Sequence, residues 1–342
     1  MKKLLATTAL VGSVALSSVS FAQTTITGSM DLTYRSTTGG TGQGDTFFGR
    51  ETQVNLANKG KLSNGLDYAA GFSLEFDGMQ TRAGTATTSV DNEGVYFNII
   101  SGGTTFHVGT DWIQNSKQDL IGAVGDVLDE VATVVPGGTT LITGYVGASE
   151  VKESMGLGVV QNFGNGITAS AYYAPNYNNT GGGNNGQSLN NSTGTNGAYE
   201  IGIRGANIGG SGINLNIWKN EVEKTTGDVE GLNGRAYTIG YAKAPFSADI
   251  GKLKSTSTAN VDTDTKLGQI SYSINKDITA SIVRTETSRS GLTKDEEINS
   301  LMLGYSLGPV ALLFTASRVE AAGGSATAAD IDQFGLSLNT RF

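Results

Sequence analysis

The chain has 342 residues, with 16% charged residues, 49 glycines, one histidine, no cysteine and a formal net charge of −8. The absence of cysteine excludes disulfide scaffolds, iron–sulfur clusters and zinc fingers, and a single histidine excludes histidine-rich metal sites. The acidic balance argues against a nucleic-acid partner, whose binding surface would be basic. We therefore expect no metal and no organic cofactor.

Residues 1–22 are predicted to be a signal peptide. Two lysines precede an uncharged segment, and small residues stand just before the predicted cleavage site after Ala22. A transmembrane anchor is the alternative, but the segment is short and diluted by serine and threonine. The predicted mature domain is then 23–342. Loss of the two lysines takes the basic total from 23 to 21 against 31 acidic residues, a net charge of −10.

From residue 23 onward, apolar and polar residues alternate. In 26–35, apolar residues or glycine occupy the even positions and polar residues occupy most odd positions, and 66–77 and 334–342 repeat this pattern. Successive side chains of a strand point to opposite faces, so each run predicts a strand with one apolar and one polar face. Each run has about the ten residues that a tilted strand needs to cross a bilayer.

Counting these runs gives sixteen predicted strands. They cover residues 24–36, 48–57, 66–77, 94–101, 104–110, 154–163, 167–174, 198–206, 212–219, 234–242, 246–254, 265–274, 278–286, 297–307, 310–319 and 331–342. Short turns, such as 101–103, 164–166, 275–277 and 308–309, alternate with longer polar loops. An even number of strands with alternating short and long connections is typical of outer-membrane barrels.

A soluble sandwich or solenoid is the alternative all-β fold. A soluble barrel would place its apolar face inside, whereas an outer-membrane barrel places it outside, between aromatic girdles. Aromatic residues at apolar positions near the ends of runs favour the membrane barrel: Tyr34, Phe76, Tyr173, Tyr199, Tyr237, Tyr241, Phe246, Tyr272, Tyr305 and Phe314. The predicted fold class is all-β, a 16-stranded antiparallel transmembrane β-barrel.

Three segments resemble the general Gram-negative porins: the opening strand 25–29, the strand–turn–strand 62–66 and the closing strand 334–342. The resemblance extends over the whole mature chain and implies an outer-membrane location. It also implies a homotrimer in which a loop after the fifth strand folds into each barrel and narrows it. In this family the barrel-assembly machinery reads a terminal phenylalanine, which makes Phe342 the expected assembly signal.

The loop that the resemblance calls for is 111–153, between the fifth and sixth predicted strands. Apolar residues recur there at helical spacing: Leu120, Val124, Val127, Leu128, Val131 and Val135. Asp119, Asp126 and Glu130 cluster on the opposite helix face, with Asp129 at its flank. Two interpretations stay open: an ordinary surface helix, or a short constriction helix whose acids face the lumen and set ion preference. Whether these acids bind a calcium ion is also open.

The resemblance further implies a ladder of arginines facing the acidic loop. Arg35 faces the lumen by its position in the alternation, and Arg82 lies in the second external loop. Arg50 has the parity of the apolar face and reaches the lumen only if a bulge shifts the register. We call these three arginines and the loop acids Asp119, Asp126, Asp129 and Glu130 the constriction set, because they are the residues expected to line the narrowest part of the channel.

The predicted function is a passive, water-filled diffusion channel for small hydrophilic solutes and ions, weakly cation-selective, and not an enzyme. His107, facing inward, has no second histidine and no cysteine beside it in the sequence and is expected to be a wall residue. A substrate-specific channel is one alternative, and would need aromatic or basic residues along the lumen, where Trp218 is the one large indole expected. A non-conducting adhesin or structural barrel is the other.

Overall fold

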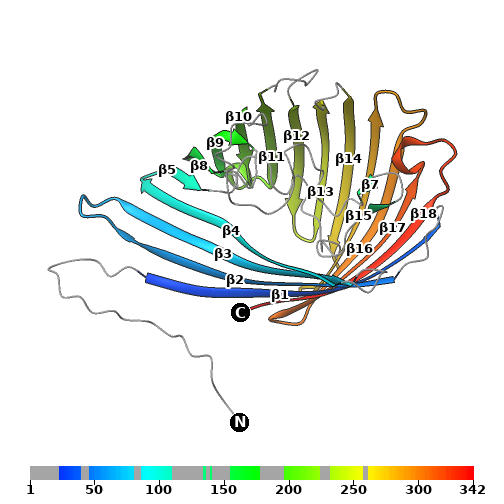
Figure 1. Cartoon of the computed structure of the whole chain (residues 1–342), viewed down its shortest axis with the longest axis horizontal. Coiled ribbons are helices and arrows are strands. Elements are labelled where there is room, and N and C mark those ends of the chain that lie inside the picture. The colour runs from blue at the N-terminus through cyan, green and yellow to red at the C-terminus, as the bar shows by residue number, and fades with distance from the viewer. Residues whose placement is uncertain are drawn as a thin grey trace, which may run out of the picture.

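The computed structural model describes residues 23–39, 46–80, 86–109, 134–135, 139–140, 155–177, 196–223, 232–256 and 261–342. Sixteen strands close into one barrel, and each strand lies between its neighbours in the sequence (Figure 1). Every pairing is antiparallel, which confirms the predicted number and direction of the strands. The predicted signal peptide lies outside the described residues.

The barrel strands are β1 (Gln23–Gly39), β2 (Thr46–Lys61), β3 (Asp67–Gln80), β4 (Ala86–Ser101), β5 (Thr104–Gly109), β8 (Gly156–Gly164), β9 (Ile167–Tyr177), β10 (Asn196–Gly205), β11 (Ile213–Val222), β12 (Leu232–Lys243), β13 (Phe246–Thr256), β14 (Asp262–Ser273), β15 (Ile278–Arg289), β16 (Glu296–Ser306), β17 (Val310–Glu320) and β18 (Ile331–Arg341). Short 3-10 turns follow β10, at η1 (Ile208–Gly210), and β17, at η2 (Ala322–Gly324). Within the described residues no helix is long and apolar enough to cross a membrane.

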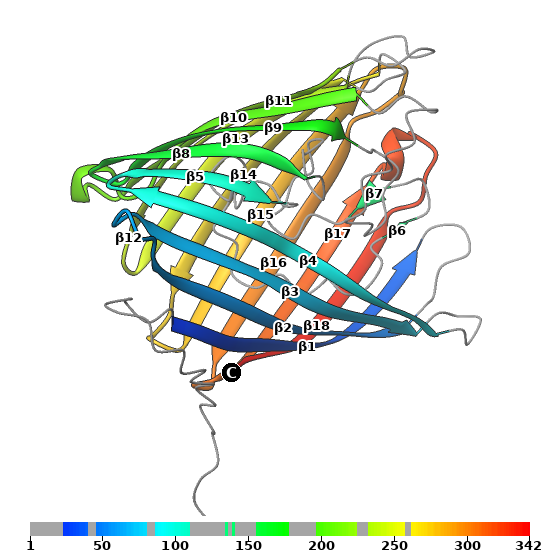
Figure 2. The same ribbon diagram turned by 60° about the vertical axis from the view of Figure 1, so that its left-hand side comes forward.

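The first and last strands close the barrel. β1 pairs with β18 from Ser29 opposite Arg341 to Gly39 opposite Ile331 (Figure 2). One step further, Gly28 and Phe342 exchange two backbone hydrogen bonds, with N···O distances of 2.7 and 2.9 Å. Closure pairs the first strand with the last, so no sheet edge is left with unpaired backbone N–H and C=O groups. Hydrocarbon offers such groups no hydrogen-bond partner.

Side chains of opposite character face the two sides of the wall. Ile239 is 52% exposed and Ile282 is 64% exposed on the outer face, whereas the adjoining Thr238 and Ser281 are buried on the inner face. The alternation that predicted these strands therefore places the large apolar side chains outside. This is the arrangement expected of a membrane barrel and the reverse of a soluble one.

A row of aromatic rings crosses the closing seam on the outer face. Phe314 lies edge-on to Phe334 at a centroid distance of 5.0 Å, Phe334 lies 6.2 Å from Tyr34, and Tyr34 lies 5.2 Å from Phe48. Such edge-to-face pairs contribute roughly 0.5–1.5 kcal/mol each beyond the area they bury. The row adds side-chain contacts to the hydrogen bonds that join β17, β18, β1 and β2.

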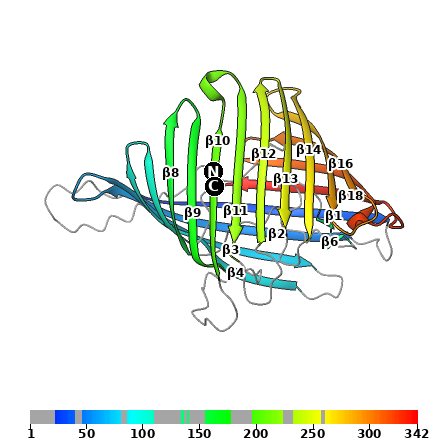
Figure 3. The same cartoon turned by 90° about the horizontal axis from the view of Figure 1, so that it is seen from above.

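The two-residue turns of the barrel lie at one edge, and its longest connections lie at the other. At the edge with short turns, backbone bonds join each turn to the next strand end or turn around the barrel, and β8 to β14 run side by side up to this edge (Figure 3). In each bond a backbone N–H donates to a carbonyl of the preceding connection: Asn162 to Gly103 (N···O 2.7 Å), and, each at 2.8 Å, Ala206 to Gly166, Ala242 to Gly212, Ser273 to Pro245 and Ser306 to Asp277. We call this series the turn-to-turn bonds.

Two elements differ from the sequence-based expectation. β4 begins at residue 86 instead of 94, and its register against β3 shifts between Gly71 and Ser73. A bulge of this kind exchanges the inward and outward positions of the residues beyond it. The alternation of apolar and polar residues therefore breaks at the bulge, and the first half of β4 was not recognised as part of the strand. Val135, expected on the loop helix, lies instead in β6 (Val134–Val135), which pairs with β7 (Thr139–Thr140). Valine and threonine, the residues of these two strands, are β-branched and favour strand over helix. The rest of the predicted helix lies outside the described residues.

The turn between β8 and β9 provides a test of the short-turn edge. Gly164 and Gly166 both have positive φ, 77° and 80°. A Cβ at Gly166 would lie 2.0 Å from the carbonyl oxygen of Ala206, whereas a Cβ at Gly164 would meet nothing within 4 Å. We expect Gly164→Ala to destabilise the barrel by only the ~1–2 kcal/mol of a left-handed residue. Gly166→Ala should cost clearly more, because it also forces two turns apart.

The measurement is the midpoint temperature at which the folded, heat-modifiable form in detergent is lost. Equal midpoints for the two variants would show that contact between neighbouring turns contributes nothing to stability.

Candidate functional site

Carboxylates gather on the inner wall of β1, β2 and β3. Asp31 lies directly opposite Glu51, and Gln53 lies directly opposite Glu75. The inner position follows from parity, since Thr33 and Arg35 on the same face of β1 are buried. Sequence reasoning did not single out these acids, because only the pairing of three strands brings them together. We call Asp31, Glu51 and Glu75 the wall acids.

Polar neighbours hold the wall acids in place. Asp31 accepts hydrogen bonds from the hydroxyl of Ser337 and from the amide Nδ2 of Asn339, the latter at 3.0 Å. The amide of Gln53 donates to Glu75 at 3.1 Å.

The predicted arginines separate in the structure. Arg35 faces inward as expected, is 2% exposed, and donates from Nε to the hydroxyl of Thr37 at 3.2 Å. Arg50 lies opposite Leu32 on the outer face, and the β1–β2 ladder contains no register shift that would turn it inward. Arg50 is therefore removed from the constriction set, because the bulge that it required is absent from this pairing.

The remaining members of the predicted constriction set cannot be placed. Arg82 and the loop acids Asp119, Asp126, Asp129 and Glu130 lie outside the described residues. Their role in a constriction stays a prediction.

A second part of the inner wall, on β9 to β11, is buried and polar. Glu200 lies opposite Tyr172 on one side and Asn220 on the other, and all three side chains are at most 2% exposed. Trp218, predicted to face inward, does so and is 1% exposed. A tryptophan this deeply buried offers no ring surface on which a passing solute could stack.

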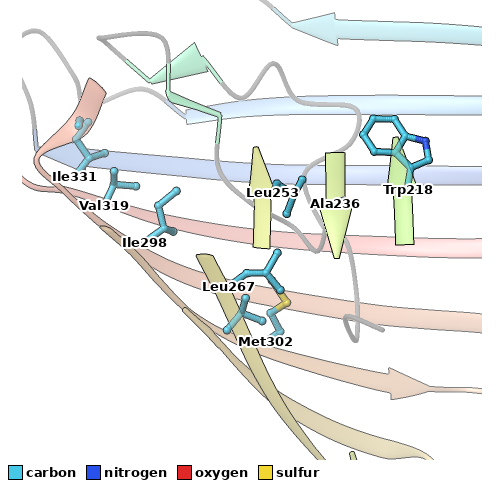
Figure 4. Close-up of a cluster of buried hydrophobic side chains, with 10 residues drawn as sticks. Trp218, Ala236, Leu253, Leu267, Ile298, Met302, Val319 and Ile331 are labelled. Carbon is cyan, nitrogen blue, oxygen red and sulfur yellow. The ribbon is translucent and has the colours of Figure 1, made fainter. Parts of the chain in front are cut away.

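A group of apolar residues also faces inward, contrary to the simple rule of one apolar face per strand (Figure 4). We call it the inner apolar cluster, and its members come from the β11–β18 half of the barrel: Trp218, Ala236, Leu253, Leu267, Val283, Ile298, Met302, Val319, Ala322 and Ile331. Leu267 lies against Met302, and Ile298, Val319 and Ile331 form a row across three strands. Each is 5% exposed or less. Single positions of this kind within polar-facing runs were not recognised from the sequence.

His107 is a wall residue, as predicted. Its Nδ1 lies 2.8 Å from Oδ1 of Asn98, and its ring lies 6.0 Å from that of Tyr172. The Tyr172 hydroxyl donates to the carbonyl of Gly109, the last residue of β5, at 3.0 Å. Across the described ranges, no three histidine, cysteine, aspartate or glutamate side chains come together in a way that could hold a metal ion.

Comparison with known proteins adds to this geometry. The family model described as Gram-negative porin matches residues 6–339. An anion-selective porin from Comamonas acidovorans has a TM-score of 0.63 at 11% identity, covering 94% of this chain and all of that one. A mutant of the Rh. blastica porin has a TM-score of 0.62 at 14% identity, with the same coverage. A loop-deletion mutant of OmpT, an outer membrane protein of Vibrio cholerae, has a TM-score of 0.60 at 12% identity, covering 94% and 99%. None of the curated proteins matches the sequence.

The bond from Tyr172 to Gly109 ties down the end of β5, and its removal is testable. Tyr172→Phe should raise the amide hydrogen-exchange rate of 107–109 about fivefold, since a net hydrogen bond contributes on the order of 1 kcal/mol. Tyr173→Phe is the matched control, because that hydroxyl lies on the outer face and forms no hydrogen bond with the described residues. Equal exchange in both variants would mean that the bond does not hold this strand end.

Proposed function

This chain belongs to the Gram-negative porin family, and we propose that its barrel is a passive, water-filled channel for small hydrophilic solutes and ions. The observation that carries the proposal is the closed barrel of sixteen strands with an apolar outer face and a largely polar inner face. Barrels of this size leave an aqueous channel. Solutes would move down their own gradients across the outer membrane, with no catalytic step and no cofactor.

The charges of the inner wall favour weak cation selectivity. The wall acids lie on the inner face, and Arg35, the arginine of the expected set that faces inward, is almost wholly buried. A carboxylate acts on a passing ion within about one Debye length, roughly 8 Å at physiological salt, so position matters more than total charge. Since one protein of similar fold is anion-selective, the fold alone does not determine selectivity, and the lining charges do.

The inner apolar cluster supports the proposed constriction loop. Apolar residues that face into a wet barrel are stable only when covered. The apolar face predicted for 111–153, from Leu120 to Val131, has the chemistry to cover them. Packing of that face on the cluster would turn Asp119, Asp126 and Glu130 toward the lumen, with Asp129 beside them.

The remaining parts of the proposal rest on the family or, for the signal peptide, on the sequence alone. They are the homotrimer, the signal peptide 1–22 and the role of Phe342 as a signal for the barrel-assembly machinery. Of the two alternatives, the substrate-specific channel is disfavoured by the burial of Trp218. The non-conducting barrel is tested directly by conductance in a planar bilayer, where a porin gives stepwise current increases.

Ion selectivity provides the sharpest test of the proposed function. We expect a positive preference for cations that falls or reverses in Asp126→Asn/Glu130→Gln and falls in Asp31→Asn/Glu75→Gln. The measurement is the reversal potential across a planar bilayer under a salt gradient. Glu297→Gln/Asp332→Asn is the control, because it removes the same charge from the outer face.

The two double variants separate the two sources of selectivity. An unchanged potential in the loop variant would place the loop acids away from the current path, and an unchanged potential in the wall variant would do the same for the wall acids. An equal shift in the outer-face control would attribute selectivity to total charge.

Deletion of Phe342 tests the proposed assembly signal. The ring is 68% exposed at the end of the closing strand, where a partner can reach it. We expect the truncated chain to yield less folded barrel in the outer membrane but to refold normally from urea into detergent, with Phe342→Tyr behaving like the parent chain. A parallel loss in both settings would assign Phe342 to barrel stability instead of recognition.

A further inference from the structure

Five cations gather on the outer face of β11 to β14, just beyond the apolar residues of these strands. They are Lys219, Arg235, Lys252, Lys254 and Lys266, which we call the outer basic patch. Their outward direction follows from the alternation, because the adjoining Trp218, Ala236, Leu253 and Thr265 are buried on the inner face. The patch lies toward the edge with the longer connections.

The register places like charges directly opposite one another within the patch. Lys219 pairs with Arg235, Arg235 pairs with Lys254, and Lys252 pairs with Lys266. Directly opposed like charges destabilise an antiparallel sheet. An arrangement of this kind is tolerated more easily when an anion binds between the charges.

Carboxylates on the same face compensate the patch incompletely. Asp264 is shared by Lys252 and Lys254, at N···O distances of 3.0 and 3.1 Å. Glu286 pairs with Lys266 at 2.7 Å and Glu221 with Lys219 at 3.2 Å, while Asp262, nearer the loops, accepts from the Thr256 hydroxyl at 2.7 Å. Arg235 has no ion-pair partner within the described part of the chain.

Two other cations on the outer face, Arg284 and Arg318, each pair with at least one carboxylate. Arg318 lies within 4 Å of three carboxylates, those of Glu320, Asp330 and Asp332, and Arg284 pairs with Glu297 at 2.6 Å. Both of these arginines are thus compensated by carboxylates, whereas, among the described residues, Arg235 of the patch is not. This contrast provides a matched control for the patch.

Directly below the patch on each strand lies an exposed apolar side chain. Ile217, Tyr237, Ile250 and Ile270 occupy these positions, one or two outward positions closer to the short-turn edge. A lipid whose acyl chains lie along these residues has its headgroup level with the cations. We propose that the outer basic patch binds the phosphate of a phosphorylated lipid in the outer leaflet of the membrane. This inference depends on the outer-membrane location and not on conduction.

The experiment uses the folded barrel in detergent and lipid A that carries both of its phosphates as the probe. Binding is followed by native mass spectrometry and by titration. Arg235→Gln/Lys254→Gln should weaken binding about 30-fold, since each surface cation contributes roughly a fivefold factor toward an anionic lipid. The control Arg284→Gln/Arg318→Gln removes the same charge from the same face and should change affinity less than about twofold, because those arginines are already compensated.

Further binding measurements identify the part of the lipid that the patch recognises. Dephosphorylated lipid A should bind the parent barrel as weakly as phosphorylated lipid A binds the patch variant, and added salt should weaken only the phosphorylated form. Arg235→Lys/Lys254→Arg should retain binding, which separates charge from a folding defect. Unchanged channel conductance in the patch variant would show that the channel is intact.

Several outcomes would overturn the inference. Equal affinity of the parent and patch variants, or equal losses in the patch and control variants, would remove the patch as a site. Competition by inorganic phosphate at an affinity equal to that of lipid A would assign the site to a free anion. Patch-dependent association of two barrels without lipid would assign it to a second copy of the chain.

Discussion

The pairing of β1 with β18 is the constraint on which the rest of this structure depends. A sheet of sixteen strands left open would expose two rows of unpaired backbone groups, and hydrocarbon offers no partner for them. The hydrogen bonds between Gly28 and Phe342, and the aromatic row from Phe314 to Phe48, lie across that join. Once the ring is closed, each residue of a strand has only two directions available, into the barrel or out toward the lipid.

These two directions give the acidic and basic residues different tasks. Asp31 and Glu75 face water and ions, and they are held by hydroxyl and amide groups. Lys219 and Lys254 face outward beyond the apolar side chains, where they pair with Glu221 and Asp264. A total charge of −8 says little about either task. What decides the chemistry is which face each charge occupies and which residue the register puts opposite it.

The sequence predicted the number of strands, their order and the inward direction of Arg35 and Trp218, because a period of two is a strictly local property. It could not predict what depends on pairing between strands. The wall acids become neighbours only through the β1–β2–β3 register, and the shift between Gly71 and Ser73 reverses parity without any local mark beyond glycine. The inner apolar cluster was missed for a related reason. A single apolar residue at an inward position of one strand, such as Leu253 or Val319, does not indicate a cluster until the pairing of eight strands brings such residues together.

The turn-to-turn bonds have a mechanical consequence for the end of the barrel with the short turns. Five successive links from Gly103 to Ser306 join connections that are otherwise separated by whole strands, so they act as a hoop around much of that rim. A hoop resists changes of circumference and of roundness. Under lateral pressure from the membrane, the end with the short turns would therefore keep a nearly constant cross-section.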